Sequence, residues 1–399
     1  MKGKKVTVGV TGGIAAYKAA ELVRLLVREG GQVSVAMTRN ATRFITPITF
    51  QALTGSPVIW DMFAQEGPDM EHISWAQQSD MIVVAPATAN IIGKMACGIA
   101  DDFLSTMLLA STAPILLCPA MNVKMYENPV VQENLTRLKE RGIHIMEPQE
   151  GVLACKAEGK GRLPEPGAIF ERIKGIIAPK DLEDYKLLVT AGPTVEPIDP
   201  VRFISNHSSG RMGYALARAA RDRGAHVVLV SGPTSLTPPY GVEFHRVETA
   251  QEMKEVVVDT APQCDAVIKA AAVSDYRPKA QASQKLKKGA KTLKLELVKN
   301  PDILAELGKM KDKAPGRPIL VGFAAETQDL LANARKKLEA KNLDMIVAND
   351  VSRSDAGFQV ETNQVKLIFR NGGIKELPLM SKEKVAHKIL DHVKDMLGA

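Results

Sequence analysis

The alternation of apolar and polar positions follows one pattern twice along the chain. Residues 4–38 run as an apolar strand, KKVTVGV, a TGG turn, a helix with an apolar face, IAAYKAAELVRLLVREG, and a second strand, QVSVAMT. Residues 186–231 repeat this order with KLLVTAG, a loop, GRMGYALARAARDRG and HVVLVS. Strands that alternate with helices predict a parallel sheet with helices on both faces. The pattern therefore predicts two doubly wound α/β domains.

A helical segment flanked by prolines, PEPGAIFERIKGIIAPKDLEDY, separates the two copies. Such a segment is typical of a junction between domains. A chain of 399 residues is also too long for one ordinary core. We therefore predict one domain over residues 1–186 and another over residues 187–399.

The apolar stretches are too short for a helix that spans a membrane. Residues 81–89 and 115–120 are the most apolar, and both fall well short of the roughly 20 residues that a bilayer requires. The start, MKGKKVTVGVTGGIAAYK, has the basic lead and apolar run of a secretory signal but lacks a small-residue cleavage site. We therefore interpret it as the first strand and its turn, and we expect no membrane partner.

Cysteine usage and charge indicate a cytoplasmic protein that handles small molecules. The four cysteines are scattered and form no Cys-x-x-Cys pair, which predicts a reducing cytoplasm. The formal charge is +7, but the basic residues are spread over helix faces and one lysine-rich loop, and aromatic residues make up only 5%. This distribution favours phosphorylated small substrates over nucleic acid.

The glycine turn after the first strand of each copy does not fit a dinucleotide site. The next strand ends in Thr38 in one copy and in Ser231-Gly232-Pro233 in the other, where a carboxylate would bind the adenosine ribose. Neither copy completes a spaced G-x-G-x-x-G. The glycines instead favour the approach of another phosphate to a helix N-terminus, where free N–H groups attract an anion.

The carboxyl ends of the first strands predict one binding site. Ligands of open parallel sheets bind beyond these ends, which places the turn at residues 12–13, Thr38 and the loop 86–90 together. Small residues there leave room for a flat ring, and Thr88 and Asn90 can hydrogen-bond to its edges. Taken singly, these two residues are also explained as turn formers or as a helix N-cap.

Three further residues are candidates for chemistry in the first half. His72 precedes a strand, and Asn122 lies in PAMNVKMYENP, after the strand APILLC. Cys155 lies in GVLACKAEGKGRLPEP, a glycine-rich loop that could fold over the site as a lid. Considered alone, His72 is also explained as a structural histidine and Cys155 as an ordinary thiol.

The segments GGIAAYK, FITPITFQALTG, HI, APATAN, PAMNVKMYENP and ACKAEGKGR together resemble the flavin-dependent phosphopantothenoylcysteine decarboxylase family. The resemblance covers essentially all of residues 5–170 and implies a flavodoxin-like domain with bound FMN. It implies FMN contacts from the glycine turn, the strand ends and the following loops: Gly12, Gly13, Ile14, Ala15, Thr38, Phe44, Pro86, Ala87, Thr88 and Asn90.

The same resemblance implies roles in decarboxylation for three residues. The flavin would oxidise the thiol-bearing carbon to a thioaldehyde, carbon dioxide would leave, and the resulting enethiolate would be reduced again. His72 matches the active-site histidine of the family, a candidate base. Asn122 matches the residue that holds the substrate carboxylate, and Cys155 matches the lid cysteine that supplies a proton in the final reduction.

The second half carries a separate set of motifs. TAGPTVEPIDPVRFISNHSSGRMG places Asn206, Ser208 and Ser209 at a helix start, where the serines are also explained as caps. AAAVSDYRPK, QKLKKGAK, KNPDIL, VGFAAET and KKLEAKNLDMIVAND follow at the ends of predicted strands and helices. Lysines on a loop beside strand ends suit a triphosphate, although a lysine run is also a common solvated face.

These segments resemble phosphopantothenate–cysteine ligase, and a decarboxylase followed by a ligase is the order of the bacterial bifunctional enzymes. The resemblance implies CTP and Mg²⁺, with ligands for the metal left open. The carboxylate of 4′-phosphopantothenate would attack the α-phosphate to give an acyl-cytidylate, from which the amine of L-cysteine displaces CMP. The product, 4′-phosphopantothenoylcysteine, would then be decarboxylated to 4′-phosphopantetheine.

The resemblance assigns Lys285 to offset the charge that builds on the phosphates and Asn206 to orient the acyl carbonyl for the amine. Lys269 departs from the family pattern, which has a small or apolar residue there, so its contact with the nucleotide stays open. The implied nucleotide contacts come from several segments: Lys269, Ala270, Ala271, Asp275, Lys285, Pro301, Asp302, Ile303, Leu304, Phe323, Lys337 and Lys341.

Two further expectations concern the whole protein. A flavoprotein regulator that binds partners and has lost its chemistry is an alternative function, but the presence of His72, Asn122 and Cys155 argues against it. Decarboxylases of this family are trimeric or built of trimers, with the flavin near the subunit boundary, and the ligase half resembles a dimer. The resemblance therefore predicts a homo-oligomer, with a dodecamer as a closed assembly.

Overall fold

The computed structural model describes residues 1–62, 71–152, 158–287, 293–313, 318–326, 330–350 and 360–398. Its contacts divide the chain into two compact units, Met1–Ala178 and Pro179–Ala399. Residues 179–186, counted above with the first domain, fall in the second unit. Leu182 is fully buried in the core of that unit, and Asp181 forms an ion pair with Arg223 at 2.7 Å.

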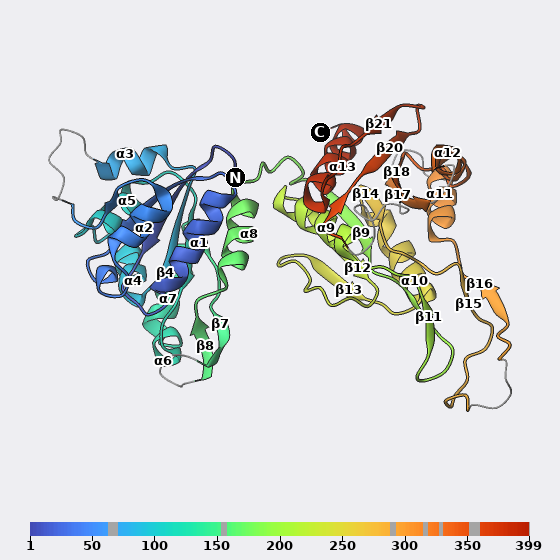
Figure 1. The fold of residues 1–399 in the computed structure, drawn as a ribbon, viewed down its shortest axis with the longest axis horizontal. Coiled ribbons are helices and arrows are strands. Elements are labelled where there is room, and N and C mark those ends of the chain that lie inside the picture. The colour runs from blue at the N-terminus through green and yellow to red at the C-terminus, as the bar shows by residue number, and fades with distance from the viewer. Residues whose placement is uncertain are drawn as a thin grey trace. The chain divides into compact units, whose positions relative to one another are not determined.

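The first unit contains a six-stranded parallel sheet (Figure 1) with the order β3-β2-β1-β4-β5-β6. Its strands are β1 (Lys5–Val10), β2 (Gln32–Met37), β3 (Val58–Ile59), β4 (Met81–Ala87), β5 (Ile115–Pro119) and β6 (His144–Ile145). The strand order reverses between β1 and β4, where doubly wound sheets bind ligands. The predicted doubly wound fold is confirmed.

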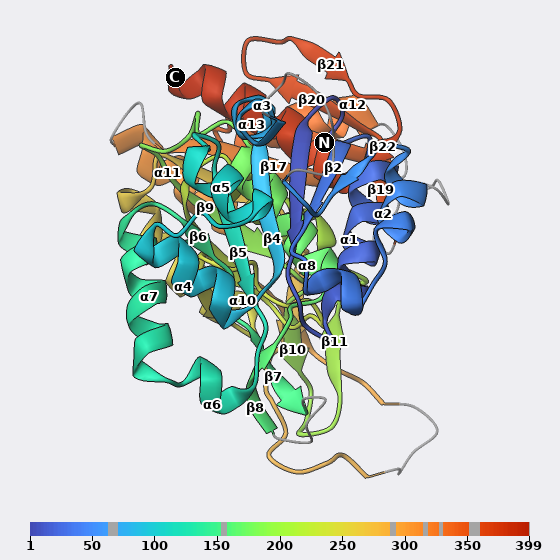
Figure 2. The same cartoon turned by 90° about the vertical axis from the view of Figure 1, so that its left-hand side faces the viewer.

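Helices cover both faces of this sheet (Figure 2), because each presents one apolar face. In α1, for example, Ala19, Leu22, Val23 and Leu26 are buried. One face is covered by α1 (Ala16–Arg28), α2 (Pro47–Thr54) and α8 (Pro166–Ile177). The other is covered by α3 (Glu71–Gln78), α4 (Ala89–Cys97), α5 (Phe103–Ala110) and α7 (Pro129–Glu140).

The second unit contains an eight-stranded sheet with the order β13-β12-β9-β14-β17-β18-β20-β21. Its strands are β9 (Lys186–Ala191), β12 (His226–Ser231), β13 (Glu243–Arg246), β14 (Ala266–Lys269), β17 (Ile319–Glu326), β18 (Met345–Asp350), β20 (Val365–Phe369) and β21 (Ile374–Glu376). The first six strands are parallel and take the same relative order as the sheet of the first unit. The last two are antiparallel, an extension that the repeated pattern did not predict.

Helices again cover both faces of the second sheet. One face packs against α9 (Arg211–Asp222) and α13 (Lys382–Leu397), and the other against α10 (Ala250–Thr260), α11 (Ile303–Lys313) and α12 (Leu330–Ala340). Two antiparallel pairs extend from this unit (Figure 1): β10 (Val195–Pro197) with β11 (Phe203–Ser205), and β15 (Tyr276–Pro278) with β16 (Leu297–Lys299). These pairs and the loops beside them carry most of the ligase motifs.

Shorter elements complete the fold. They are η1 (Ala41–Arg43), α6 (Val123–Tyr126), β7 (Gln149–Val152), β8 (Glu158–Arg162), η2 (Ala261–Gln263), β19 (Thr362–Asn363) and β22 (Met380–Ser381). Within the described ranges, no helix combines the length and the apolar character that crossing a membrane would need.

Candidate functional sites

A cavity of about 620 Å³ lies at the carboxyl ends of the strands of the first unit. Its walls come from the turn after β1, the turn after β4, the segment after β5 and the β7–β8 pair. The described residues that line it include Gly12, Gly13, Ile14, Ala15, Tyr17, Lys18, Pro86, Thr88, Asn122, Val152 and Arg162. The structure thus brings seven of the predicted site residues together in one cavity: Gly12, Gly13, Ile14, Ala15, Pro86, Thr88 and Asn122.

Thr11, which the sequence analysis missed, ties two walls of this cavity together. Its hydroxyl donates to the carbonyl oxygen of Pro86 at 2.7 Å and accepts from the backbone N–H of Thr88 at 3.1 Å. The side chain of Thr88 makes no capping hydrogen bond to α4, so its hydroxyl is not used as an N-cap. Thr11 is 1% exposed, and its buried bonds fix the loop after β4 against the turn after β1.

Glycine at position 12 permits a close approach of two loops. A Cβ atom there would lie 2.6 Å from Cβ of Asn40, which is too close for any side chain. A Cβ at Gly13 would meet only ordinary contacts, with Thr88 at 3.7 Å. Gly12 is therefore required by the packing of the loop after β2, whereas Gly13 leaves room on the cavity side.

Two basic side chains give the cavity positive charge. Lys18 is 7% exposed and pairs with Glu165 at 2.8 Å, and Arg162 lies 3.4 Å from the same carboxylate. The hydrogen bond from Lys18 lowers the pKa of Glu165 below its ordinary value. Neither Lys18 nor Arg162 was singled out from the sequence, because a lysine inside an amphipathic helix has the pattern of a solvated residue.

Four predicted flavin contacts lie outside the described lining of the cavity. Ala87 is buried in β4, Asn90 is exposed on α4, and Phe44 is 52% exposed after η1. Thr38 follows β2, and its hydroxyl accepts a hydrogen bond from the N–H of Ala41 at 3.3 Å. The strand-end rule predicted the edge of the sheet at which the cavity lies but not which side chains line it.

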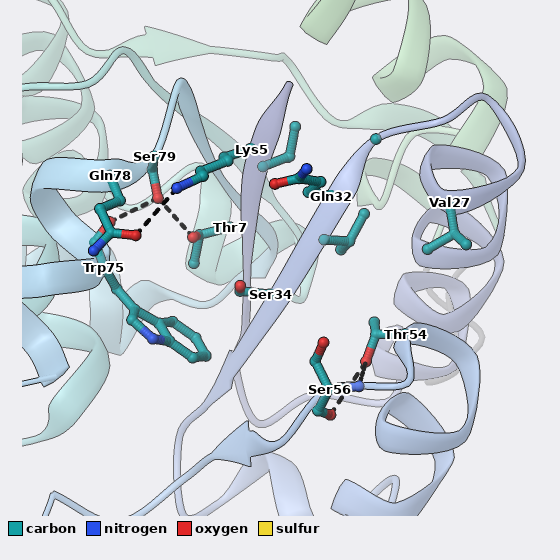
Figure 3. Close-up of a pocket in the computed structure, with 13 residues that line it drawn as sticks. Lys5, Thr7, Val27, Gln32, Ser34, Thr54, Ser56, Trp75, Gln78 and Ser79 are labelled. Atoms are coloured by element: carbon teal, nitrogen blue, oxygen red, sulfur yellow. Dashed lines mark hydrogen bonds between the residues drawn. The ribbon is translucent and has the colours of Figure 1, made fainter. Parts of the chain in front are cut away.

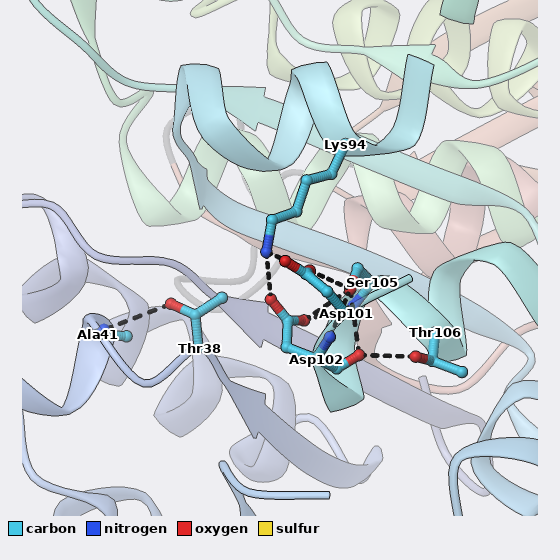
Figure 4. A network of polar contacts seen from close by, with 7 residues as sticks. All are labelled: Thr38, Ala41, Lys94, Asp101, Asp102, Ser105 and Thr106. Carbon is cyan, nitrogen blue, oxygen red and sulfur yellow. Dashed lines mark hydrogen bonds and ion pairs between the residues drawn. The ribbon is translucent and has the colours of Figure 1, made fainter. Parts of the chain in front are cut away.

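A polar network holds α4 against the start of α5, and Figure 4 shows it with Thr38. Lys94 of α4 pairs with Asp101 at 2.5 Å and with Asp102 at 2.7 Å. Asp102 also caps α5 by accepting from the N–H of Ser105 at 2.8 Å. Burial alone would lower the pKa of Lys94, but the hydrogen bonds to the two carboxylates raise it above its ordinary value.

Of the three catalytic candidates of the first unit, one lines the cavity, one lies outside its described lining, and one lies outside the described residues. His72 is half-buried on α3, with its ring edge-on to Phe103 at 6.4 Å between centroids. Asn122 lines the cavity, and its side-chain oxygen accepts from the N–H of Lys124 at 2.9 Å. Cys155 lies outside the described residues.

A second hollow of about 460 Å³ in the first unit is formed at the amino ends of β1 and β2 (Figure 3). There Thr7 and Ser79 share a hydrogen bond of 2.7 Å, and Lys5 donates to Gln78 at 3.2 Å. Its polar groups largely bond to one another, and none of the predicted site residues is among the described residues that line it. It lies at the sheet edge opposite to the one at which doubly wound folds bind ligands.

In the second unit, a pocket of about 380 Å³ lies where β14 ends and α11 begins. It brings together six predicted nucleotide contacts from three segments: Lys269, Asp275, Pro301, Asp302, Ile303 and Lys341. Ser274, Lys299 and Asn300 also line it, and none of these was singled out from the sequence. The side chain of Asn300 donates to the carbonyl oxygen of Ser274 at 2.9 Å and so fixes one wall against another.

The pocket is lined by both basic and acidic side chains. Lys341 and Asp302 form an ion pair at 2.9 Å. Burial would raise the pKa of Asp302, but the hydrogen bonds from Lys341 and from the N–H of Ala305 bring it below its ordinary value. Burial, assisted by the nearby charge of Lys341, lowers the pKa of Lys269 to about 8.

The remaining predicted nucleotide contacts, apart from Lys285, lie at other positions in the second unit. Leu304 is 5% exposed and packs into the core, so its side chain is structural. Ala271 is also buried, and its N–H donates to the hydroxyl of Thr190 at 3.1 Å. Ala270 and Phe323 are half-buried against the core on the opposite face of the sheet, while Lys337 lies on α12. None of these five is among the described residues that line the pocket.

Hydrogen bonds from Leu286 to Asp199 and from Arg202 to Leu286 position the loop that carries Lys285. Asp199 is 2% exposed and accepts from the N–H groups of Val201, Arg202 and Leu286 at 2.8, 2.8 and 3.1 Å. Arg202 donates to the carbonyl oxygen of Leu286 at 2.7 Å. Both backbone groups of Leu286 are therefore held, and the exposed Lys285 precedes it directly.

Replacing Asp199 by alanine should loosen this loop and impair the ligation in which the resemblance gives Lys285 a role. The change leaves three N–H groups and a guanidinium without their shared acceptor. We expect ligation to slow by about 10- to 100-fold, as for other misplaced catalytic groups, with unchanged decarboxylation of supplied substrate. Asp199→Asn should recover part of the rate, because an amide oxygen still accepts. Equal ligation by wild type and Asp199→Ala would remove this role.

Asn206 directly follows β11. Its side-chain amide donates to the carbonyl oxygen of Ala272 at 3.2 Å, just beyond the end of β14. Within the described ranges, no group of three or more His, Cys, Asp or Glu side chains could hold a metal ion.

Known families match both units. The Flavoprotein family matches residues 1–178, and the DNA/pantothenate metabolism flavoprotein C-terminal domain family, DFP, matches residues 182–397. The chain is thus a flavoprotein-type domain followed by a DFP-type domain.

Curated relatives match over the full length of the chain. The coenzyme A biosynthesis bifunctional protein CoaBC of Bacillus subtilis (strain 168) is 50% identical over 398 residues, which covers 98% of this chain and 97% of that protein. The protein of the same name from Escherichia coli (strain K12) is 45% identical, over 98% of this chain and 97% of its own length. A crystal structure of the C-terminal domain of a CoaBC protein is 46% identical over 55% of this chain and 98% of its own, with a TM-score of 0.47.

The chain belongs to the family of coenzyme A biosynthesis bifunctional proteins. It is a bifunctional enzyme with a decarboxylase half followed by a ligase half, which confirms the resemblance drawn from its motifs.

Proposed function

We propose that the first unit binds FMN in the cavity beyond β1 and β4 and decarboxylates 4′-phosphopantothenoylcysteine there. The observation that carries this proposal is the cavity itself, whose volume of about 620 Å³ lies in the usual range for cofactor sites. Its glycine turn at the start of α1 suits a phosphate, and Lys18 and Arg162 add positive charge. The small residues after β4 leave room for a flat ring.

The protein side chains would orient the substrate and move its protons. FMN, when bound, would supply the oxidation that makes loss of carbon dioxide possible. Asn122, in the cavity wall, would hold the carboxylate through its amide N–H groups, because its oxygen is occupied by Lys124. His72 is not among the described residues that line this cavity, and it would act as the base from a neighbouring subunit.

The absorption spectrum of the purified protein tests the cofactor. Bound FMN gives a yellow protein, and released cofactor can be identified by chromatography. Replacing Gly12 by valine should abolish the colour, because its side chain would collide with Asn40. A colourless wild-type protein that gains no flavin on incubation with FMN would contradict the proposal.

For Cys155, we propose the role of proton donor in the final reduction. Cys155→Ser should still release carbon dioxide but stall with an oxidised enethiol product and reduced flavin, because a hydroxyl is a far weaker acid than a thiol. Product analysis by mass spectrometry checks this, with Cys97→Ser as the matched control on the exposed thiol of α4. A normal yield of 4′-phosphopantetheine would contradict the role.

We propose that the second unit uses CTP and Mg²⁺ to couple 4′-phosphopantothenate to L-cysteine through an acyl-cytidylate. The pocket at the end of β14 would bind the nucleotide, and Lys285 would offset the phosphate charge. Mg²⁺ would be held mainly by the phosphates, since the described side chains offer no ready cluster of ligands. Release of pyrophosphate from CTP, compared with ATP, tests the nucleotide.

We further propose a cytoplasmic homo-oligomer, with a dodecamer built from trimeric decarboxylase and dimeric ligase contacts. Large apolar side chains are exposed at the cavity of the first unit (Ile14 and Tyr17), after η1 (Phe44), on the loop between β10 and β11 (Val201) and at the start of β11 (Phe203). Exposed apolar groups mark a contact surface where they form a contiguous patch, and we propose that these side chains take part in the subunit contacts. Light scattering of the holoenzyme gives the mass directly.

A further inference from the structure

Helix α6, which begins directly after Asn122, packs against strand β8 of the first unit (Figure 2). The backbone N–H of Met121 donates to the carbonyl oxygen of Gly161 in β8 at 3.0 Å. A Cβ atom at Gly159 of β8 would lie 3.2 Å from both methyl carbons of Val123, so the glycine lets the strand approach the helix closely. The start of α6 is therefore held against β8.

The end of α6 is tied to the segment that leads into β7. The hydroxyl of Tyr126 donates to one carboxylate oxygen of Glu147, and Lys139 of α7 donates to the other at 3.0 Å. The N–H of Met146 donates to the carbonyl oxygen of Leu117 in β5 at 2.9 Å, which holds the residue before Glu147 against the sheet. The carboxylate of Glu147 is thus a fixed anchor for Tyr126.

The bond between Tyr126 and Glu147 joins a buried hydroxyl to a charged acceptor. Tyr126 is 6% exposed. Burial alone would raise the pKa of Glu147, but the hydrogen bonds from Tyr126 and Lys139 bring it below its ordinary value. A hydrogen bond to an ionised acceptor is stronger than one between neutral groups, so this bond is well suited to fix the helix.

The short helix links Tyr126 to Asn122. The N–H of Tyr126 donates to the carbonyl oxygen of Asn122 at 2.9 Å, and Gln132 of α7 donates to the carbonyl oxygen of Tyr126 at 2.5 Å. A helix of 4 residues has little stability of its own, so its position depends on such contacts. The anchor of Tyr126 therefore also sets the position of Asn122 in the cavity wall.

We propose that Tyr126 and Glu147 are positioning residues for decarboxylation, because they hold α6 where the amide of Asn122 meets the substrate carboxylate. The inference rests on the proposed role of Asn122. Neither Tyr126 nor Glu147 is among the described residues that line the cavity, so both act through the helix.

Steady-state kinetics of the holoenzyme tests this role through the carboxylate itself. The substrate 4′-phosphopantothenoylcysteine has the carboxylate that Asn122 would hold, whereas the product 4′-phosphopantetheine lacks it. Tyr126→Phe keeps the ring and removes only the hydroxyl. We expect kcat/KM for the substrate to fall by about ten- to hundredfold, as for other displaced catalytic groups, while the inhibition constant of the product changes by less than about twofold.

Variants of Glu147 show whether the hydroxyl acts through this carboxylate. Glu147→Ala should lower kcat/KM as Tyr126→Phe does, and the double variant should be no worse than either single variant, because the same bond is lost in all three. Glu147→Gln should recover part of the rate, because an amide oxygen still accepts from the hydroxyl. Additive losses in the double variant would overturn the pairing.

Two matched controls remove similar groups elsewhere. Glu140→Gln neutralises an exposed carboxylate at the end of α7. Tyr214→Phe removes a buried tyrosine hydroxyl of the second unit, which accepts from Thr234 at 3.3 Å. Both should decarboxylate within about twofold of the wild-type rate, and the flavin spectrum of every variant checks that the cavity is intact.

Asn122→Ala separates this proposal from the proposed role of Asn122. It should lower kcat/KM for the substrate and leave product inhibition unchanged, the same pattern as Tyr126→Phe. If Asn122→Ala shows this pattern and Tyr126→Phe does not, the positioning role is overturned while the role of Asn122 stands. Equal losses of kcat/KM and of product inhibition in Tyr126→Phe would indicate a general loosening of the cavity and would also overturn it. If Asn122→Ala keeps the wild-type kcat/KM, the role of Asn122 fails and the positioning role with it.

Discussion

His72→Asn should abolish decarboxylation while the protein stays yellow and still ligates. The imidazole is the candidate base of the first unit, and loss of a positioned base costs about 10²- to 10⁴-fold in rate. His72 is half-buried on α3 against Phe103 and does not line the cavity of its own chain in the described structure. Flavin binding should therefore survive its replacement.

Carbon dioxide release from supplied 4′-phosphopantothenoylcysteine is the measurement, with the flavin spectrum as a check on folding. His144→Asn is the matched control, because it removes the other imidazole of the first unit, from β6 at the far edge of the sheet. It should decarboxylate at nearly the wild-type rate. Full release of carbon dioxide by His72→Asn would remove His72 from the mechanism.

Mixing the His72→Asn chain with a chain that lacks flavin would locate the base. If the histidine acts across a subunit boundary, hetero-oligomers of His72→Asn with a Gly12→Val chain should regain part of the activity, because one chain supplies the cavity and the other supplies the imidazole. Mixed oligomers that stay inactive would place both groups in one subunit.

Lys285→Gln should release no pyrophosphate from CTP and 4′-phosphopantothenate, even without cysteine. Its exposed ammonium would offset phosphate charge as the acyl-cytidylate forms, and removing one such group costs about 10²-fold or more. Lys287→Gln is the matched control, because Lys287 is also exposed and directly follows the hydrogen-bonded Leu286 on the same loop. The control should form the intermediate normally.

Asn206→Asp should form the cytidylate and then accumulate it when cysteine is added. The amide of Asn206 donates to the carbonyl oxygen of Ala272, and a carboxylate in its place would be repelled both by that oxygen and by the acyl phosphate. Chromatography of the reaction mixtures shows whether each variant forms and accumulates the cytidylate. The result decides whether Lys285 acts before Asn206. If the lysine variant accumulates the intermediate while the asparagine variant never forms it, the order is reversed.

Both ligase variants should decarboxylate supplied 4′-phosphopantothenoylcysteine at the wild-type rate, because the two sites lie in separate units. Their melting behaviour should also match wild type, since neither side chain is buried. A loss of both activities in either variant would indicate a folding defect.

Local patterns predicted the elements of the fold. The apolar strands β1 and β9, the glycine turns after them and the amphipathic helices α1 and α9 follow from periodicity over adjacent residues. Long motifs also identified the family. Position at a strand end predicted that Gly12, Pro86 and Thr88 share a site, because parallel strands end at one edge.

Contacts between distant segments could not be predicted in this way. Asp199 and Leu286 are 87 positions apart, and Thr11 and Pro86 are 75 apart, yet each pair is joined by a hydrogen bond. The sequence around Asp199 or Thr11 does not distinguish a buried, hydrogen-bonded side chain from an exposed one. The antiparallel strands β20 and β21 were missed for the same reason, since their direction depends on packing.

The sequence by itself determined the two α/β units, their family and the segments that form each site, because periodicity, turn residues and long motifs are local properties of the chain. The tertiary structure alone decided which side chains meet. It placed Lys18 and Arg162 in the cavity of the first unit, packed Leu304 into the core and left the hydroxyl of Ser274 without a hydrogen-bond partner among the described residues. Burial and pairing depend on the packing of segments far apart in sequence, which fixes the environment, and hence the chemistry, of each polar group.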